Sequence, residues 1–528
     1  RFETLSSLGE AQGDALRFRS SQAWLVEALL SETSDLGADE QFREQLSRLA
    51  HFRSIEAAHE PQDFVGELRP YQREGLGWLQ FLERQHFGGC LADDMGLGKT
   101  IQLLAWVLDR RARLTQPAPT LVVAPKSLTH NWISETRRFA PALSVLDYTG
   151  ATRRNLAEQI ARHDLVVTTY GTLRNDIDVL AQPRFDCVVL DEAQAIKNAD
   201  TLTAKAARLL KAEHRLALSG TPIENHLGEL WSLFEFLNPG MLGRSSLFAR
   251  LTEAQRDSEA ERQSRQLLAR AVKPFVLRRT KEQVLRDLPA KTEQTILCEL
   301  DPAARREYDE LRDHYRRALL HEPGGAKPDS FIVLEALLRL RQAACHPGLI
   351  DASRVDEPSP KLEALFESVD EIVDAGHKAL IFSQFTSFLG IVRERVRQRG
   401  LSFAYLDGAT SAKARVEEIK RFQDDPKCSL FLLSLKAGGV GLNLTAADYV
   451  FLLDPWWNPA VEAQAIGRSH RIGQTRSVFA YKLVCADTVE ERVLELQARK
   501  RELAAVLLDG EATTLRDLTR DDIERLLA

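Results

Sequence analysis

The distribution of hydrophobic and polar residues divides the chain into two alternating regions joined by a helical one. From about residue 68, short runs rich in β-branched residues alternate with segments of helical periodicity, and the same alternation resumes from about residue 360. Such alternation is typical of a parallel sheet that helices cover on both faces. The sequence therefore predicts an α/β protein with two parallel-sheet lobes.

Short apolar runs mark the predicted strands. Those of the first lobe are residues 121–124, 165–169, 187–190 and 216–219; those of the second are 379–382, 403–406, 430–433, 450–453 and 478–483. Residues 226–345 are dominated by Leu, Arg and Glu and predict a mostly helical bridge. After the second lobe, one helical face carries Val489, Val493, Leu496, Leu503 and Leu507. This spacing predicts a helix that packs back across the lobes.

These patterns define five predicted segments. Residues 61–240 form the first lobe, 241–357 a helical bridge, 358–488 the second lobe and 489–528 a C-terminal brace. Residues 1–60 contain two helical stretches, 23–30 and 42–55, but no motif, and the chain begins at Arg1 without a methionine. We therefore expect this segment to be the tail of an upstream domain.

Composition narrows the class of protein. The chain has 528 residues, of which 44% are hydrophobic and 28% charged, enough for two large domains. It contains no run of roughly 20 apolar residues and no signal-like start, which predicts a cytoplasmic location. The six cysteines include no Cys-x-x-Cys, so neither a zinc site nor a disulfide framework is expected. The net charge of -6 means that any contact with DNA must be local.

A glycine-rich turn supplies the first chemistry. Residues 93–100 read Asp-Asp-Met-Gly-Leu-Gly-Lys-Thr, followed by a helical pattern at 101–108. Glycines let backbone N–H groups surround phosphates, Lys99 adds charge, and the Thr100 hydroxyl can bind Mg²⁺. The general phosphate-binding pattern has glycine at the position of Asp93. The alternative is therefore an ordinary surface turn that binds no phosphate.

A second motif decides between these readings. The apolar run 187–190 ends in Asp191 and Glu192, as expected of a buried strand that delivers carboxylates at its carboxyl end. We predict that Thr100 and Asp191 share Mg²⁺, directly or through water, and that Glu192 orients and deprotonates the attacking water. A structural ion pair is the alternative for Glu192. Together the motifs predict binding and hydrolysis of ATP.

Positive charge for the transferring phosphate is predicted to come from the second lobe. Arg468 and Arg471 lie three residues apart in a glycine-framed block at 464–474, about one helical turn, so both can face one side. Arginine pairs with phosphate oxygens through its planar fork and can act as an arginine finger. A solvated helix face is the alternative.

Taken in order, many blocks of the chain resemble the motifs of superfamily-two helicase-like ATPases. They are residues 68–72, 93–100, 121–126, 168–170, 191–194, 218–225, 381–386, 433–443 and 464–474. The closest resemblance is to the SWI/SNF-type branch, through Gly-Arg-Ser-His-Arg-Ile-Gly-Gln at 467–474, Trp-Asn-Pro at 457–459 and Leu-Arg-Arg-Thr-Lys at 277–281. The resemblance runs from about residue 65 to 495. No histone-reading module is recognised, so the chain looks bacterial.

The resemblance implies two RecA-like lobes with ATP and Mg²⁺ in their cleft. It implies that Gln72 reads the adenine edge with Arg69 or Tyr71 nearby, and that Gly220 and Thr221 couple hydrolysis to the gap between lobes. The full predicted ATP set is Arg69, Gln72, Asp94, Met95, Gly96, Leu97, Gly98, Lys99, Thr100, Ile101, Gln194 and Gly439. The predicted DNA contacts are Lys126, Thr169, Ser383, Gln384, Ser434, Lys436 and Trp457.

Two positions depart from the family pattern. Gln194 stands where the family usually has histidine, and Ser469 stands where alanine is frequent. Glutamine can still donate and accept hydrogen bonds, so we expect it to keep the contact on the phosphate side. The departure puts the strength of coupling between ATP and DNA in question.

We therefore expect a monomeric motor that translocates on double-stranded DNA without reading its sequence. Its target would be a protein–DNA complex, and in a bacterium it would associate with the nucleoid. One alternative is a helicase that separates strands, since it shares the same nucleotide chemistry. Another is a nucleotide-gated DNA-binding scaffold with little turnover, which the intact Lys99, Asp191, Glu192 and Arg471 argue against.

Overall fold

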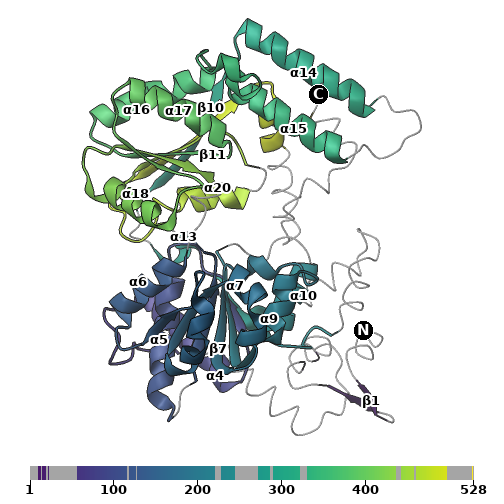
Figure 1. Cartoon of the computed structure of the whole chain (residues 1–528), viewed down its shortest axis with the longest axis vertical. Coiled ribbons are helices and arrows are strands. Elements are labelled where there is room, and N and C mark those ends of the chain that lie inside the picture. The colour runs from purple at the N-terminus through teal and green to yellow at the C-terminus, as the bar shows by residue number, and fades with distance from the viewer. Residues whose placement is uncertain are drawn as a thin grey trace. The chain divides into compact units, whose positions relative to one another are not determined.

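The chain folds into two compact units, Arg1–Arg286 and Asp287–Ala528 (Figure 1). The computed structural model describes residues 10–12, 15–18, 22, 26, 56–115, 118–126, 128–220, 227–243, 272–285, 289–320, 330–435, 442–456, 459–495 and 526. Each unit is built around one parallel sheet. The predicted α/β class with two parallel-sheet lobes is thereby confirmed.

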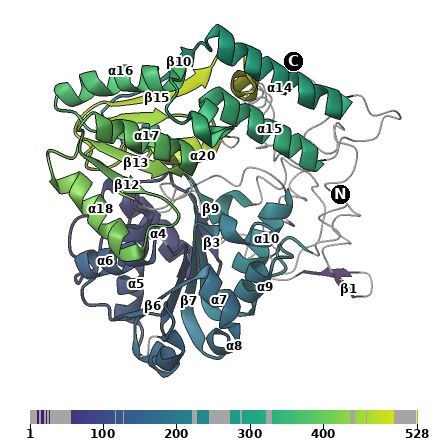
Figure 2. The same ribbon diagram turned by 45° about the horizontal axis from the view of Figure 1, so that its top comes forward.

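The first unit contains a seven-stranded sheet in the order β5-β6-β4-β7-β8-β3-β9, with every pairing parallel. The strands are β3 (Gly89–Leu91), β4 (Thr120–Ala124), β5 (Val145–Asp147), β6 (Leu165–Thr169), β7 (Arg184–Asp191), β8 (Lys211–Leu218) and β9 (Val276–Leu277). Helices α4 (Pro70–Arg84), α5 (Lys99–Arg113), α6 (Thr129–Phe139), α7 (Tyr170–Asn175), α8 (Ile177–Leu180), α9 (Leu202–Leu209) and α10 (Leu227–Leu237) lie on its two faces (Figure 2). The short helix α13 (Lys281–Val284) follows β9.

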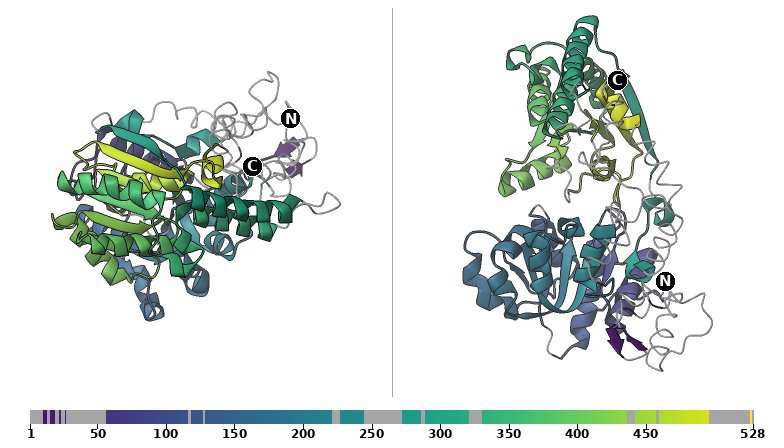
Figure 3. Two further views of the ribbon diagram at one scale, coloured as in Figure 1. Left: turned by 90° about the horizontal axis from the view of Figure 1, so that it is seen from above. Right: turned by 90° about the vertical axis from the view of Figure 1, so that its right-hand side faces the viewer.

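The second unit contains a six-stranded parallel sheet in the order β10-β15-β14-β11-β13-β12. Its strands are β10 (Lys291–Cys298), β11 (Ala379–Ser383), β12 (Phe403–Leu406), β13 (Leu430–Ser434), β14 (Tyr449–Leu452) and β15 (Val478–Cys485). Its helices are α14 (Pro302–Leu320), α15 (Ser330–Cys345), α16 (Pro360–Asp374), α17 (Thr386–Gln398), α18 (Ala412–Asp424) and α20 (Pro459–Ile466). The long helices α14 and α15 pack side by side (Figure 3).

All nine predicted strands are present. Where their observed bounds differ from the predicted ones, the difference is a few residues. Within the two parallel sheets, the prediction missed β3, β5, β9 and β10. The last two lie within the segment predicted as a mostly helical bridge, and the boundary between the units, at Arg286 and Asp287, also falls there. The bridge therefore contributes an edge strand to each sheet.

The helices predicted at the two ends of the chain can be compared with the structure only where residues are described. Residues Glu10–Gln12 (β1) and Ala15–Arg17 (β2) pair antiparallel, where a helical tail was expected. The predicted helices at 23–30 and 42–55 lie almost entirely outside the described residues. Near the other end, Val489 and Val493 are buried in the core of the second unit, whereas Leu496, Leu503 and Leu507 lie outside the described residues.

In the part of the chain that the structure describes, no helix has the length and apolar character needed to cross a membrane.

Candidate nucleotide and DNA site

The glycine-rich turn predicted to bind phosphate, called here the phosphate turn, comprises residues 93–98. It connects the carboxyl end of β3 to the N-terminus of α5. Gly96 and Gly98 have φ values of 92° and 79°, in the left-handed region. A Cβ on Gly98 would lie 2.5 Å from Gln72 Nε2, so only glycine fits there. Lys99 is the first residue of α5, and its Nζ donates to the carbonyl oxygen of Asp93 at 2.5 Å. This geometry is that of an anion site at a helix N-terminus.

The Asp93 side chain explains why glycine is absent from that position. Asp93 is fully buried, and Arg279 pairs with it bidentately through Nε–Oδ1 and Nη2–Oδ2 distances of 2.9 and 2.6 Å. Arg279 also donates from Nη2 to Gln102 Oε1 at 2.9 Å and from Nη1 to the carbonyl oxygen of Tyr71. A fork of this kind fixes geometry as well as charge. The departure from the general pattern is thus a structural device that anchors the phosphate turn.

The segment around β9 also holds the backbone of the phosphate turn. Ala92 N donates to Leu277 O at 2.7 Å, and Asp94 N donates to Arg279 O at 3.0 Å. The Asp94 carboxylate in turn accepts from Lys281 N at 3.0 Å. Residues 277–281 carry a signature of the resembled family and lie within the segment predicted as a helical bridge. In the structure they support the backbone of the glycine-rich turn at the candidate nucleotide site.

We expect Arg279→Ala to lower the free energy of unfolding of the first unit by about 3 to 5 kcal/mol, because it leaves the Asp93 carboxylate buried and unpaired. Urea unfolding followed by tryptophan fluorescence measures the change. Arg278→Ala is the matched control, since its side chain is exposed. Equal losses in both variants would show that the buried pair does not anchor the turn.

The Gln72 amide is engaged within the chain. Its Nε2 donates to Leu97 O at 3.0 Å, and its Oε1 accepts from Arg69 N at 2.9 Å in the N-terminal turn of α4. The Tyr71 hydroxyl donates to the same Leu97 carbonyl at 2.9 Å, and burial raises its pKa to about 12. Gln72 therefore ties α4 to the phosphate turn, and adenine recognition by its amide stays a prediction.

Asp191 and Glu192 lie at the carboxyl end of β7, one strand away from β3 across β8. Asp191 Oδ2 accepts from Trp132 Nε1 at 2.8 Å, and Oδ1 accepts from Glu192 N at 2.9 Å. Burial, followed by the Glu192 carboxylate, raises the pKa of Asp191 to about 7, although the Trp132 hydrogen bond and the Lys99 charge oppose this. A desolvated carboxylate near a lysine favours an added cation.

Gln194 links the acidic pair to the next strand. Its Nε2 donates to Glu192 Oε2 at 2.8 Å, and its Oε1 accepts from Ser219 Oγ at 3.5 Å, just beyond β8. Gly220, the residue after Ser219, lies beside the phosphate turn. A Cβ built on Gly220 would be 3.5 Å from Met95 Cε. Glu192 itself has φ 50°, a conformation that non-glycine residues rarely adopt. The glutamine thus provides a hydrogen-bonded path from Glu192 to Ser219.

The donor set fits the predicted Mg²⁺ ion. Mg²⁺ typically uses one or two protein oxygens together with water and substrate phosphates. Thr100 follows Lys99 at the start of α5, and Asp191 supplies a buried carboxylate. No cluster of three or more His, Cys, Asp or Glu ligands occurs among the described residues, so an all-protein metal cage is not seen there.

We expect the effect of Asp191→Asn on the free energy of unfolding of the nucleotide-free protein to depend on pH and to be more favourable at pH 8 than at pH 5. The folded-state pKa of Asp191, about 7, exceeds its ordinary value of 3.8, so the wild type loses stability as pH rises through about 4 to 7. The neutral amide removes that loss, so the variant should gain about 1 to 3 kcal/mol relative to the wild type between pH 5 and pH 8, on top of a pH-independent cost of replacing one acceptor oxygen by a donor. Urea unfolding of both proteins at each pH measures it.

Urea unfolding of the same two proteins can also test whether Asp191 helps to bind Mg²⁺. Adding Mg²⁺ with a nonhydrolysable ATP analogue should stabilise the wild type more than the variant at pH 8. A difference in unfolding free energy that does not change with pH would contradict the raised pKa.

The two arginines of the second unit have different surroundings. The helix α20 ends at Ile466, and residues 467–474 form successive turns and bends, so this segment is not the helical turn that the spacing of Arg468 and Arg471 suggested. That both side chains face one side stays a prediction. Arg468 is 1% exposed, whereas Arg471 is half-buried and its Nη1 donates to Leu442 O at 3.3 Å. Gln474 holds the turn through Nε2 bonds to Ala447 O and Ser469 O at 2.8 and 3.2 Å.

Comparison with known proteins now identifies the family. The model of the SNF2-related domain matches residues 71–349, more than half of the chain, and that of the helicase conserved C-terminal domain matches residues 361–473. The chain belongs to the SNF2-related family. The predicted family is therefore confirmed.

Several SNF2-related proteins are similar over most of the chain. An uncharacterized ATP-dependent helicase of Mycoplasma pneumoniae is 38% identical over 464 residues, 88% of this chain and 44% of the relative. The putative ATP-dependent helicase/translocase YwqA of Bacillus subtilis is 38% identical over 502 residues, 92% of this chain and 53% of the relative. The human TATA-binding protein-associated factor 172 is 34% identical, over 97% of this chain and 32% of its own length.

The chain spans about half the length of the bacterial relatives. Among solved structures, the SWI2/SNF2 ATPase core of Sulfolobus solfataricus in complex with double-stranded DNA is 35% identical. That match covers 88% of this chain and 98% of that chain, with a TM-score of 0.44.

The DNA contacts predicted for this SNF2-related chain have varied surroundings. Lys126 is exposed. The Thr169 hydroxyl caps α7 by accepting from Thr172 N at 3.0 Å. Ser383 is fully buried with its hydroxyl donating to Asp454, so its side chain is not presented to a DNA phosphate in this structure. Ser434 is 4% exposed. Lys436 and Trp457 lie outside the described residues, as do Thr221, which was predicted for coupling, and Gly439, which was predicted for ATP binding.

Proposed function

We propose that this SNF2-related chain is an ATP-dependent translocase on double-stranded DNA. The observation that carries the proposal is the meeting of two motifs at one sheet edge of the first unit. Lys99 begins α5 after β3, Asp191 ends β7 and Glu192 follows it. The bacterial relatives in the family are named ATP-dependent helicases and a putative helicase/translocase. The carboxyl edge of a parallel sheet is where nucleotides bind in such folds.

The proposed chemistry is phosphoryl transfer to water. Lys99 and the backbone of residues 96–100 would hold the phosphates, while Thr100 and Asp191 would hold Mg²⁺, which neutralises phosphate charge. Glu192, whose carboxylate is oriented by Gln194, would orient the attacking water and accept its proton. Arg471 of the second unit would stabilise the transferring phosphoryl group when the units close. Arg468, which is buried, would shape the turn that presents Arg471.

Motion on DNA would follow from a change in affinity between nucleotide states. The Glu192, Gln194 and Ser219 path ends beside Gly220, so a change at the phosphates can reach the end of β8. Closing of the units on ATP and reopening after hydrolysis would then alternate the grip on the duplex. Binding would be mainly to phosphates, hence nonspecific and salt-sensitive.

The deciding experiment is ATP turnover with and without duplex DNA, together with triplex displacement and strand displacement. We expect strong stimulation by duplex, displacement of the third strand and no unwinding. Strand displacement instead would favour the helicase alternative. Tight DNA binding with negligible turnover would favour the nucleotide-gated scaffold, and hydrolysis that ignores DNA would refute the motor.

A further inference from the structure

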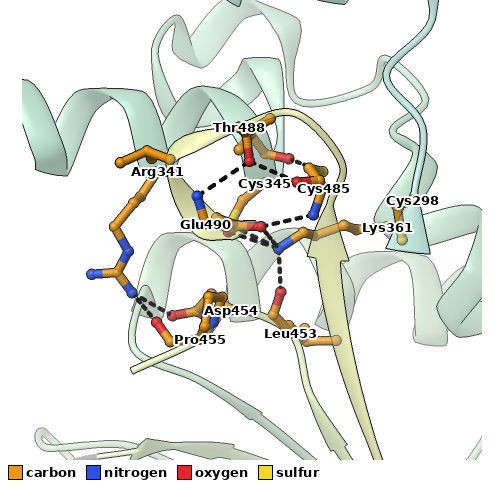
Figure 4. Close-up of polar contacts among 12 residues, drawn as sticks. Cys298, Arg341, Cys345, Lys361, Leu453, Asp454, Pro455, Cys485, Thr488 and Glu490 are labelled. Carbon is orange, nitrogen blue, oxygen red and sulfur yellow. Dashed lines mark hydrogen bonds and ion pairs between the residues drawn. The ribbon is translucent and has the colours of Figure 1, made fainter. Parts of the chain in front are cut away.

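The buried charges at the carboxyl edge of the second sheet are paired within the chain (Figure 4). Lys361 and Glu490 are both fully buried, with Nζ 2.6 Å from Oε2. The Arg341 guanidinium lies 3.7 Å from the Asp454 carboxylate and donates to Gln384 Oε1 at 3.2 Å. Gln384 Nε2 is itself buried, so this amide belongs to the network, and its contact with DNA stays a prediction. The charges of this network are therefore satisfied by one another.

A cavity of the same unit has a different charge pattern. It lies beside the edge strand β12, has a volume of about 300 Å³, and is lined by residues of α17, β12, α18 and the loop before β12. That volume is at the lower end of the range of small-molecule sites. Three arginines line it, Arg393 and Arg397 of α17 and Arg421 of α18, and we call it the arginine cavity. None of its lining residues is a predicted ATP or DNA contact.

Two aromatic rings of β12 hold the α17 arginines in place. Arg393 Cζ lies 4.9 Å from the centre of the Tyr405 ring, and Arg397 Cζ lies 5.9 Å from the centre of the Phe403 ring. The two arginines are four residues apart and share a helix face, and the two rings are two residues apart and share a strand face. Stacking restricts the guanidinium groups before a ligand arrives, which lowers the entropy cost of binding.

The arginines of the cavity are poorly neutralised by the chain. Among the described residues, the Arg393 guanidinium has neither a hydrogen bond nor an ion pair, and its covered Nε leaves the terminal N–H groups as donors. Arg397 pairs with Glu394 at 3.5 Å, but both side chains are more than half exposed, so the pair is weak. Arg421 donates to the uncharged Ser402 Oγ at 3.3 Å.

Glu418 is the single acid among the lining residues, and it already has a partner. Its Oε2 accepts from Tyr405 N at 3.1 Å, a backbone donor of the edge strand. Three guanidinium groups and one carboxylate leave the lining with two net positive charges, in a chain whose net charge is -6. Like charges around one cavity repel each other, and a bound anion relieves the repulsion.

We propose that the arginine cavity binds a small molecule through a phosphate group with at least two negative charges, either inorganic pyrophosphate or a phosphate monoester. The planar fork of arginine pairs with two phosphate oxygens and stays charged at any working pH. Two negative charges match the net charge of the lining, whereas each phosphate of a DNA backbone carries one. The inference does not rest on the proposed function, because it concerns binding alone.

The test is calorimetric titration of the full chain with pyrophosphate in the absence of Mg²⁺. The phosphate turn can take the same anion, so all titrations use a Lys99→Ala background. We expect one binding site to remain there, and either Arg393→Gln or Arg421→Gln to weaken it about tenfold, the size expected for one hydrogen bond to a charged group. Arg399→Gln is the matched control, because it removes the same charge from an exposed position at the end of α17. Its effect should stay within about twofold.

The melting temperature distinguishes a ligand site from a structural role. Without ligand, Arg421→Gln should leave the melting temperature unchanged or raise it, because one of three like charges is removed. Pyrophosphate should raise the melting temperature of the Lys99→Ala protein but not that of the Lys99→Ala/Arg421→Gln protein. A parallel titration with glycerol 3-phosphate distinguishes the two sources: binding of this compound identifies a monoester, and binding of pyrophosphate alone identifies the free anion.

Two results would overturn the inference. One is a Lys99→Ala protein that binds neither anion, or that binds them equally well after Arg393→Gln and Arg421→Gln in folded variants. The other is binding of duplex DNA that these substitutions weaken, with no binding of either anion, which would assign the cavity to a DNA backbone. No titration depends on ATP turnover, so a failure of the motor proposal would be seen separately, in the wild-type ATPase measurement.

Discussion

Replacing Lys99 by alanine is expected to lower DNA-stimulated ATP turnover at least about 10³-fold, because the fixed charge that stabilises the outer phosphates is lost. In the structure this ammonium is directed into the phosphate turn, where it donates to Asp93 O. Phosphate release at saturating duplex DNA measures the loss. DNA affinity without nucleotide should stay within about twofold of the wild type, since one charge outside the DNA interface is removed.

Lys205→Ala provides the control for this variant. Lys205 is an exposed lysine on α9 of the same unit, so its removal changes the net charge equally and should leave turnover unchanged. A Lys99→Ala protein that keeps a tenth of the wild-type turnover would show that the turn is not the site of hydrolysis.

Replacing Arg471 by alanine is expected to lower the maximal rate by about 10³ or more, the range found for arginine fingers. The affinity for nucleotide should change little, because the phosphate turn belongs to the first unit. Single-turnover rates and the affinity for a fluorescent ATP analogue distinguish these two effects. A loss confined to nucleotide affinity would assign Arg471 to binding rather than to the transition state.

Two neighbouring arginines serve as comparisons for Arg471. Arg476 is 58% exposed and pairs with Asp448 at 3.4 Å, so Arg476→Ala should leave turnover near that of the wild type. Arg468 is buried, so Arg468→Ala should lower the melting temperature of the second unit, an effect that Arg471→Ala should not share. If Arg476→Ala impaired hydrolysis as strongly as Arg471→Ala, the loss of rate would reflect removal of positive charge in general, and Arg471 would have no specific role as an arginine finger.

The central strands of both sheets could be predicted because they are buried on both faces and read as continuous apolar runs. The edge strands could not. Strand β10 reads Lys-Thr-Glu-Gln-Thr-Ile-Leu-Cys, and its first five residues are exposed. Strand β9 has only two residues, too few to show any periodicity. Both strands are specified by backbone pairing with a neighbour rather than by the pattern of their own side chains.

The candidate site was predictable where its residues lie close together in the sequence. Residues 93–100 and 191–192 were recognisable as local motifs, and the structure places both at the carboxyl edge of the first sheet. The Asp93–Arg279 pair spans 186 residues, and no local spacing reports such a contact. The turn at 467–474 shows a related limit, since an i, i+3 spacing fits a helix and a series of turns equally. Gly467 and Gly473 argued against a continuous helix, because glycine is unfavourable inside helices.

The pairing of β9 with β3 bears on how the protein could be made in pieces. The buried partner of Asp93 is translated 186 residues after it, so the phosphate turn can acquire its anchor only after that intervening segment has been synthesised. A gene fragment ending at residue 240, where the motif pattern suggests a stop, would encode the lysine, the threonine and both acids but not the guanidinium beneath them. Dissection of the polypeptide should therefore cut beyond Leu285.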